Sequence, residues 1–144
     1  MTLSLLQASR IVDAALAEGE RRGFHPLCVA VLDAGGHVLA LKRDHRASVY
    51  RPQIATAKAS SCIGMGFGGR ELVRRAQAMP AFFGALSGVL PNGLLPVPGG
   101  VLIRAAAGTG VIGAVGISGD TSENDESCAV AGILAAGLIA DTGA

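Results

Sequence analysis

The sequence has few aromatic residues and almost no net charge. Among 144 residues there are no tryptophans, one tyrosine and four phenylalanines, and 12 lysines and arginines nearly balance 11 aspartates and glutamates, for a formal net charge of +1. Nucleic-acid-binding surfaces need a field of positive charge and aromatic platforms for the bases. Because both are missing, no nucleic-acid partner is expected.

Long hydrophobic runs and paired cysteines are also missing. The apolar stretch at residues 129–140 is too short and too interrupted by glycine to span a membrane, and Asp13 and Glu18 argue against an N-terminal signal peptide. The three cysteines are widely spaced and form no C-x-x-C pair, so neither a zinc knuckle nor a disulfide framework is indicated. These features predict a cytoplasmic protein with no membrane partner.

Familiar catalytic and cofactor motifs are absent or misplaced. Neither G-x-S-x-G nor H-E-x-x-H occurs. Residues 64–69 and 108–113 match G-x-G-x-x-G, but the first match follows a predicted helix and the second leads into a predicted strand. A dinucleotide site needs a strand before the motif and a helix after it, so we interpret both matches as accidental.

What remains is the pattern of a single α+β domain over residues 1–144. A capping box from Ser4 to Gln7 opens an amphipathic helix that ends at Gly23, and a second capping box is predicted at residues 122–125. Apolar runs predict four strands, over residues 27–32, 37–41, 101–105 and 111–117. Helical spacing predicts three further helices, over residues 48–63, 70–78 and 123–139.

Small apolar residues dominate this domain. Half of the residues are hydrophobic and only 16% are charged, which predicts that other subunits cover part of the surface in a homo-oligomer. Glycines at positions 110, 113, 116 and 119 repeat every third residue along one predicted strand. Such a strand lets another backbone or a flat ligand come close.

Residues 94–100 read Leu-Leu-Pro-Val-Pro-Gly-Gly and predict a shaped loop, because proline lacks an amide donor and fixes φ. The amides of Val97, Gly99 and Gly100 can face outward from it. Residues 96–100, the proline–glycine loop, either close a pocket or form only a tight chain reversal.

Several charged residues are open to two interpretations. Lys58 interrupts a small apolar helix face, so it either reaches the surface or projects a cation into a site walled by the proline–glycine loop. Asp125 and Glu126 fall in the first turn of the last helix, where a favourable interaction with the helix dipole ranks above catalysis. Arg43 with Asp44 forms either a solvated ion pair or an anion-binding arm.

The three histidines, His25, His37 and His45, are candidate ligands of a metal or haem, which needs only one or two well-placed imidazoles. A solvated loop histidine is the simpler interpretation for each of them.

Six segments in order carry a resemblance to a known family. They are VAVLDAGGHVL (29–39), RDHRA (43–47), ATAKA (55–59), LPVPGG (95–100), GAVGISG (113–119) and DESCAVAG (125–132). Together they span nearly the full length and resemble the GlcG/HbpS family, the haem-binding-protein-like domain that also forms the C-terminus of PduO-type corrinoid adenosyltransferases.

The resemblance implies a profilin-like sandwich, in which an antiparallel sheet of about five strands is flanked by helices, and assembly into dimers or larger rings. Some members of the family bind haem or are linked to corrinoid metabolism, and others are encoded in catabolic operons. Members often carry Met-Asp-Gly after the arginine that matches Arg43, whereas this chain has Asp44, His45 and Arg46. The difference adds an imidazole and a second guanidinium at the edge of the expected pocket.

The favoured hypothesis is a small-molecule-binding protein that holds haem or a related tetrapyrrole in an apolar cleft closed by the proline–glycine loop. Arg43, Arg46 or Lys58 would bind its carboxylates, and His45 would be the metal ligand. Further ligand contacts are predicted from Phe82, Pro98, Gly99 and Gly100.

Two alternatives stay open. One is a small cofactor-free enzyme of the isomerase, lyase or hydrolase type that acts on an aromatic or oxo-acid metabolite; amides near Gly99 and Gly100 would hold an oxyanion, Arg43 a carboxylate, and Lys58 or Glu126 would move a proton. The other is an accessory subunit without a ligand of its own. The scarcity of aromatic stacking partners counts modestly against haem.

Overall fold

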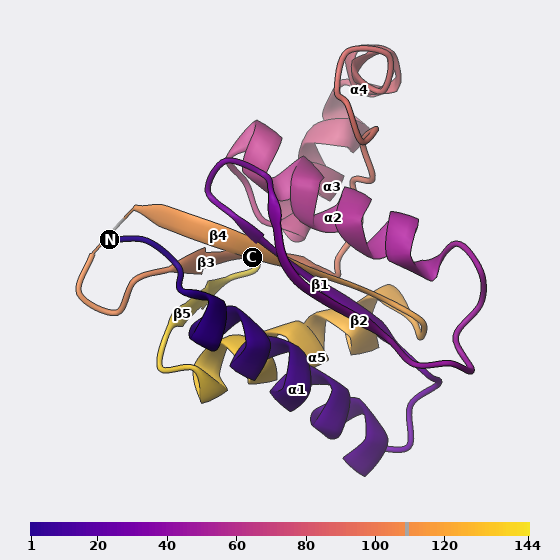
Figure 1. Cartoon of the computed structure of the whole chain (residues 1–144). Helices are drawn as coiled ribbons and strands as arrows, with labels where there is room; N and C mark the ends of the chain where they lie inside the picture. Colours follow the sequence, from indigo (N-terminus) through magenta and orange to yellow (C-terminus); the bar gives the residue numbers. More distant parts are fainter. Residues whose placement is uncertain (109) are drawn as a thin grey trace.

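Within residues 1–108 and 110–144, which the computed structural model describes, five antiparallel strands form one sheet in the order β2-β1-β4-β3-β5 (Figure 1). The strands are β1 (Cys28–Asp33), β2 (Val38–Arg43), β3 (Gly100–Arg104), β4 (Val111–Ser118) and β5 (Ile139–Asp141). The helices are α1 (Leu5–Arg21), α2 (Arg51–Met65), α3 (Gly69–Ala78), α4 (Pro80–Leu86) and α5 (Ser122–Ala135). The predicted α+β class and five-stranded antiparallel sheet are confirmed.

The sheet separates two hydrophobic layers. Helices α1 and α5 pack together on one face, and α2 with α3 covers the other (Figure 1). Alternate residues of β1 supply the two layers: Val29 and Val31 join the cluster of α1 and α5, while Leu32 joins the cluster of α2 and α3. Because helices cover both faces, β1 and β4 form continuous apolar runs, a pattern more usual for parallel sheets.

The N-terminal cap predicted from the sequence is present at α1 but not at α5. The Ser4 hydroxyl accepts a hydrogen bond from the Gln7 amide at 3.1 Å and the Gln7 side chain accepts one from the Ser4 amide at 3.0 Å, which confirms the first capping box. At α5 the cap is Thr121, whose hydroxyl accepts from the Asn124 amide at 3.1 Å. The prediction of a capping box starting at Ser122 was therefore wrong by one residue.

The end of the chain also differs from the prediction. The last helix was expected to run to residue 139, but α5 ends at Ala135 and Gly137, with a φ of 75°, turns the chain. Residues 139–141 then form β5, which pairs with β3. The helix was extended too far because an apolar run gives the same pattern in a buried helix and in a short strand.

Gly116 allows α2 to lie directly on the sheet. A Cβ atom at this position would collide with the carbonyl oxygen of Ala55 in α2. The sequence predicted that either another backbone or a flat ligand lies close to the glycine repeat. At Gly116 it is the backbone of α2. The close approach sets the position of Lys58, one turn further along α2.

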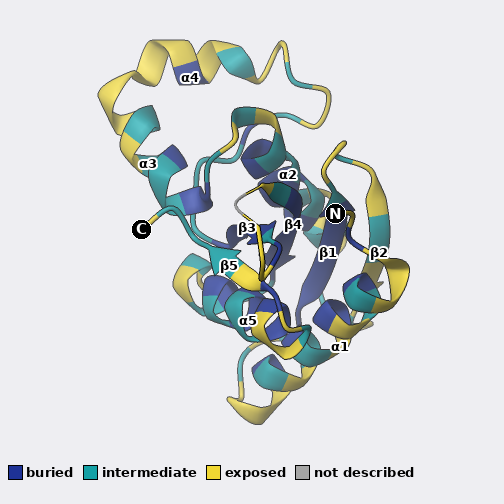
Figure 2. Ribbon diagram, turned by 90° about the vertical axis from the view of Figure 1, so that its left-hand side faces the viewer, coloured by how far each residue is buried: buried dark blue, intermediate teal, exposed yellow. Residues whose placement is uncertain are grey.

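Helix α4, which the sequence did not predict, projects from the body of the molecule and is largely exposed (Figure 2). Its Phe82 is 55% exposed, and Met79 and Val89 on either side of the helix are exposed as well. Phe83 is buried in the core of the α2 layer, and the partly buried Leu86 packs against the same cluster.

Candidate functional site

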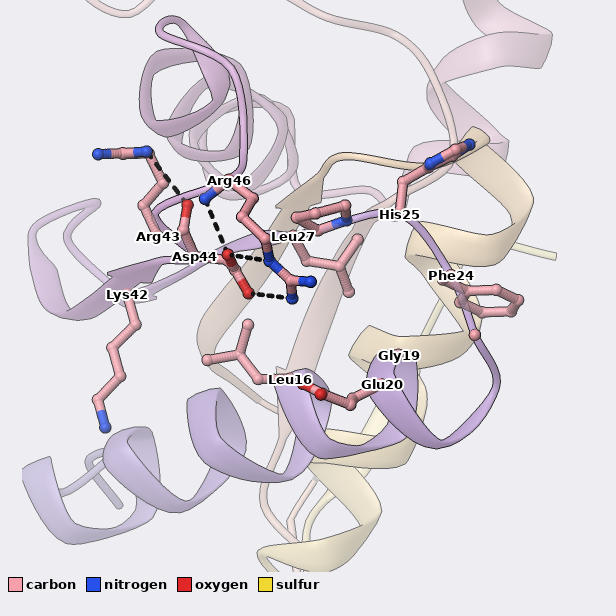
Figure 3. Close-up of a pocket in the computed structure, with 12 residues that line it drawn as sticks. Leu16, Gly19, Glu20, Phe24, His25, Leu27, Lys42, Arg43, Asp44 and Arg46 are labelled. Carbon is pink, nitrogen blue, oxygen red and sulfur yellow. Dashed lines mark hydrogen bonds and ion pairs between the residues drawn. The ribbon is translucent and has the colours of Figure 1, made fainter.

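A groove opens where the end of α1 meets the end of β2 (Figure 3). Its volume is about 430 Å³, and its walls come from the last turns of α1, from residues 23–27 and from residues 42–46. Leu16, Phe24 and Leu27 supply apolar surface to these walls. The charged residues that line the groove are Glu20, Lys42, Arg43, Asp44 and Arg46. The groove therefore offers both apolar contact and a surplus of cations.

Backbone hydrogen bonds at the end of α1 shape the apolar wall. Gly23, with a φ of 70°, reverses the chain after the helix. The Phe24 amide then donates to the carbonyl of Gly19 at 2.9 Å, and the Asp44 amide donates to the carbonyl of Leu27 at 3.0 Å. The first bond holds the Phe24 backbone against the end of α1. The second joins the charged residues 42–46 to the apolar residues 23–27.

Asp44 and Arg43 fix the shape of the charged segment. The Asp44 carboxylate accepts hydrogen bonds from the amide, Nε and Nη2 of Arg46 at 2.9, 3.1 and 3.0 Å, and these bonds hold the pKa of Asp44 well below its usual range. Nη1 of Arg43 donates to the carbonyl oxygens of Asp44, His45 and Ala47 at 3.1, 3.3 and 3.0 Å. Both guanidinium groups are thus held in place before any ligand arrives.

His25 borders the groove and His45 does not, and the imidazole of His25 points away from Leu16 and Leu27 (Figure 3). The His25 amide donates to Asp120 at 2.7 Å, and this bond is the main reason that the pKa of Asp120 is lowered. The side chain of His45 is 90% exposed, with Nδ1 3.6 Å from an oxygen of Asp44, and it does not line the groove as the structure describes it. His37 borders a different hollow beside the turn between β1 and β2.

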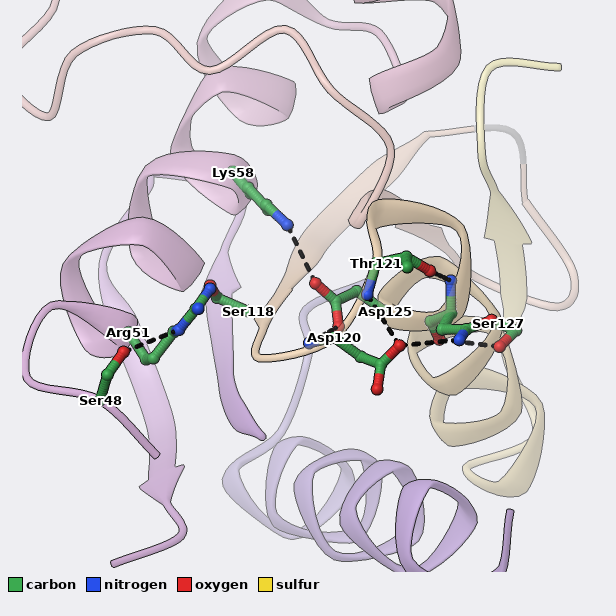
Figure 4. Close-up of polar contacts among 9 residues, drawn as sticks. Ser48, Arg51, Lys58, Ser118, Asp120, Thr121, Asp125 and Ser127 are labelled. Atoms are coloured by element: carbon green, nitrogen blue, oxygen red, sulfur yellow. Dashed lines mark hydrogen bonds and ion pairs between the residues drawn. The ribbon is translucent and has the colours of Figure 1, made fainter. Parts of the chain in front are cut away.

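Lys58 is buried and does not reach the surface. Its Nζ lies 3.2 Å from Oδ2 of Asp125, and the two side chains are only 6% and 1% exposed (Figure 4). The other carboxylate oxygen of Asp125 accepts the Asp120 amide at 3.0 Å. Burial raises the pKa of Asp125, and the neighbouring charge of Lys58 acts in the opposite direction.

Glu126, the second predicted proton-transfer residue, pairs with a different helix. Its carboxylate receives three hydrogen bonds from Arg70 of α3, between 2.8 and 3.0 Å long. Adjacent residues of α5 therefore hold two helices, Asp125 binding α2 through Lys58 and Glu126 binding α3 through Arg70. We call these two ion pairs the clamp.

The proline–glycine loop packs onto the clamp. Gly99 and Gly100 are buried, and a Cβ atom on Gly99 would lie 2.9 Å from Nζ of Lys58. Pro98 is half-buried beside them. Among the described residues that line the groove, none belongs to this loop, and Lys58, Phe82 and Glu126 are absent as well.

The predicted site residues thus fall into separate regions. Arg43 and Arg46 lie in the groove, Lys58 and Glu126 lie in the clamp beneath Gly99, and Phe82 lies on the projecting helix α4. Sequence reasoning did not single out the apolar wall of the groove. The one available signal was the break at Gly23, which exposes apolar residues directly after an amphipathic helix.

Neither a metal-binding cluster nor a membrane-spanning helix is found among the described residues. No group of three or more histidine, cysteine, aspartate or glutamate side chains within them is arranged to hold a metal ion. None of the helices in that part of the chain is both long and apolar enough to cross a membrane. The three cysteines are buried and unpaired, and burial raises the thiol pKa to about 11 for Cys28, about 12 for Cys62 and about 11 for Cys128.

Comparison with known families identifies this architecture. The family described as haem degrading protein, HbpS-like, matches residues 3–134. The chain belongs to the HbpS-like family. The resemblance to GlcG/HbpS proteins is thereby confirmed. A comparison with curated proteins found no match.

Solved structures share this fold over almost the whole chain. A PduOC–haem complex superposes with a TM-score of 0.84 at 24% identity, over 96% of this chain and 98% of that chain. ORFY from Klebsiella pneumoniae has a TM-score of 0.84 at 25% identity, over 95% and 92%. A double mutant of HbpS from Streptomyces reticuli has a TM-score of 0.80 at 27% identity, over 93% and 86%.

Proposed function

We propose that this HbpS-like protein binds haem or a related carboxylated tetrapyrrole in the groove between α1 and β2. One observation carries the proposal: the groove combines an apolar wall with the guanidinium group of Arg46, which the chain already holds in place, whereas that of Arg43 points away from Leu16 and Leu27 (Figure 3). A tetrapyrrole with free carboxylates has matching surfaces, an apolar ring and anionic side chains. Guanidinium groups suit these anions because their planar N–H fork matches two carboxylate oxygens.

The comparisons support the same ligand class. The family is described as haem degrading, and one of the similar solved structures is a complex with haem. These are properties of the family description and of that protein, and their transfer to this chain is part of the proposal.

The groove has the size of a small-molecule pocket. Its volume of about 430 Å³ lies within the range of about 300–1,000 Å³ that is typical of small-molecule pockets. Leu16, Phe24 and Leu27 would contact the ring. Arg46 would bind a carboxylate through Nη1, since Asp44 engages its Nε and Nη2. Histidine is a common haem ligand, and among the described residues His25 is the histidine that lines the groove. Bound haem would supply a redox-active iron.

The cofactor-free enzyme receives less support from the geometry. A residue that moves a proton has to reach the reacting group. Lys58 is occupied by Asp125 and Glu126 by Arg70, and in the described structure neither lines the groove. The clamp is better explained as a structural element that joins α5 to α2 and α3.

A haemin titration followed by visible absorbance tests the proposal. We expect a saturable Soret shift for the wild type and a changed Soret position with affinity reduced about tenfold or more for His25→Ala, since the variant lacks the iron ligand. His45→Ala is the matched control, because it removes an imidazole that points into solvent. An unsaturable shift that is the same in all three proteins would overturn the proposal.

We also propose that the protein self-associates. The side chains of Val49, Tyr50 and Val89 are 78%, 69% and 76% exposed. Contact of apolar surface with water is unfavourable, and burial against another copy of the chain would remove this contact. Light scattering after size exclusion measures the mass, and a monomer at every concentration would contradict this.

A further inference from the structure

Arg51 is held in place only by neutral partners. Its Nε donates to the hydroxyl of Ser48 and its Nη1 donates to the hydroxyl of Ser118, each at 3.0 Å (Figure 4). In the part of the chain that the structure describes, no carboxylate forms an ion pair with this guanidinium. Arg46 and Arg70, in contrast, are both neutralised by a carboxylate. The charge of Arg51 is therefore oriented but not compensated.

The position of Arg51 at the start of α2 is electrostatically unfavourable. The first turn of this helix contains no acidic residue, and no side chain caps its amides. The aligned peptide dipoles give a helix N-terminus partial positive charge, which repels a cation and attracts an anion. The Arg51 amide itself donates to the carbonyl of Ser48 at 3.2 Å, and Pro52 has no amide hydrogen, so the guanidinium is the main donor at this end. An anion bound beside Arg51 would offset the charge of the guanidinium and of the helix end together.

Arg51 borders a hollow with room for such an anion. The hollow has a volume of about 310 Å³ and is also lined by His25, Arg46 and Ser48. No acidic side chain lines it among the described residues. The hydroxyl of Ser118 that directs Arg51 is itself almost fully buried, so the guanidinium is fixed from the core of the protein.

The hollow continues the groove. His25, Pro26 and Arg46 line both spaces, so a molecule in the groove can extend a side group towards Arg51. Two acids that contact residues lining the hollow are already engaged, Asp44 by Arg46 and Asp120 by the amide of His25. Neither has to be displaced for an anion to reach Arg51.

We propose that the hollow around Arg51 is a carboxylate-binding site. The carboxylate comes from one of two sources. It belongs either to the ring ligand, in which case the site selects free-acid tetrapyrroles over amidated or esterified ones, or to a separate small organic acid. The first source rests on the function proposed above, and the second does not.

Two matched pairs of probes test the site. Haemin and haemin dimethyl ester differ in whether the carboxylates are free, and benzoate and benzamide differ in the same way without a ring system or iron. Absorbance titration measures the first pair, and amide chemical shifts of residues 48–51 and 118–119 measure the second. The variant is Arg51→Gln, which can still donate hydrogen bonds to the serines, and Arg10→Gln on the exposed face of α1 is the control.

We expect a preference of about tenfold or more for the free acid in at least one pair, since hydrogen bonds to charged groups are worth about that factor. Arg51→Gln should abolish the preference and Arg10→Gln should keep it. Equal binding of acid and neutral probe in both pairs, or the same preference in Arg51→Gln, overturns the carboxylate site. If haemin and its ester bind equally well, the proposed function survives and the site takes no part in tetrapyrrole binding. If benzoate binds and neither haemin nor its ester does, the carboxylate site is supported and the proposed tetrapyrrole-binding function is overturned.

Discussion

The ion pair of Lys58 with Asp125 and that of Arg46 with Asp44 have similar lengths, 3.2 and 3.0 Å, but opposite surroundings. The side chains of Lys58 and Asp125 are 6% and 1% exposed, whereas those of Arg46 and Asp44 are 58% and 22% exposed. Burial raises the pKa of Asp125, while hydrogen bonds from Arg46 lower the pKa of Asp44. An aspartate paired with a cation therefore has a raised pKa in the buried pair and a lowered pKa in the exposed pair.

The difference shows which pair is available to a ligand. A buried pair loses hydration on both partners, so each charge depends on the other and a ligand has no access to either. An exposed pair contributes little to stability, and its cation still faces solvent. On this basis we propose that the Lys58–Asp125 pair stabilises the fold and that the groove binds the ligand.

The largest effect is expected when the clamp loses its buried cation. Lys58→Met leaves the buried Asp125 carboxylate without a cationic partner, and removing one partner of a buried ion pair costs about 3–5 kcal/mol of unfolding free energy. Urea denaturation measures this loss. The double variant Lys58→Met/Asp125→Leu removes both charges and should recover most of it, because apolar replacements of buried pairs are often neutral or better. A Lys58→Met protein as stable as the wild type would contradict the structural role of the clamp.

An intermediate effect, on binding and not on stability, is expected in the groove. Arg46→Ala should weaken haemin binding about tenfold, because it removes a charged hydrogen-bond donor to the carboxylate. Its unfolding free energy should change by no more than about 0.5 kcal/mol, as is usual for exposed side chains. Absorbance titration and urea denaturation of the same preparation measure both quantities. Equal losses in the two assays would make Arg46 a structural residue.

The smallest effect concerns acid titration of the two aspartates. Carboxyl carbon shifts followed by NMR should show Asp44 protonating below the usual range and Asp125 above it. Because the folded-state pKa of Asp44 is lowered, its contribution to stability is present above the unfolded value of 3.8 and is lost as the pH falls below it. Asp125 acts with the opposite sign, since its raised pKa makes stability fall as the pH rises through the interval between 3.8 and the folded value.

Asp44→Asn tests the first of these signs. The melting temperature of this variant should depend less steeply on pH below about 4 than that of the wild type, because the titrating group is gone. An unchanged slope would show that Asp44 does not contribute to the acid limb.

Local patterns in the sequence were sufficient to predict many of the helices and strands. The capping box at Ser4 and the strand at residues 27–32 follow from the spacing of polar and apolar residues, and β1 was predicted to within one residue at each end. The segment at 139–141 was missed because a three-residue strand at the edge of a sheet has no pattern of its own and is defined by its pairing with β3.

The site was harder to predict because its residues meet only through tertiary packing. The sequence left open whether Lys58 reaches the surface, since burial depends on the distant Asp125 in α5. It favoured His45 over His25 because His45 lies beside the two arginines in the chain, whereas His25 reaches the groove through the turn after α1. Arg51 was not singled out, although an arginine in an uncapped first turn is a signal that sequence reasoning can use.

Amide chemical-shift mapping with zinc protoporphyrin IX, a diamagnetic relative of haem, tests most directly that the groove and not the clamp binds the ligand. The two regions come from different segments of the chain, so their amide signals can be followed separately. We predict saturable shifts that cluster in residues 16–27 and 42–51. Shifts that cluster instead around Lys58, residues 96–100 and residues 125–126 would contradict this account and place the ligand beneath the proline–glycine loop.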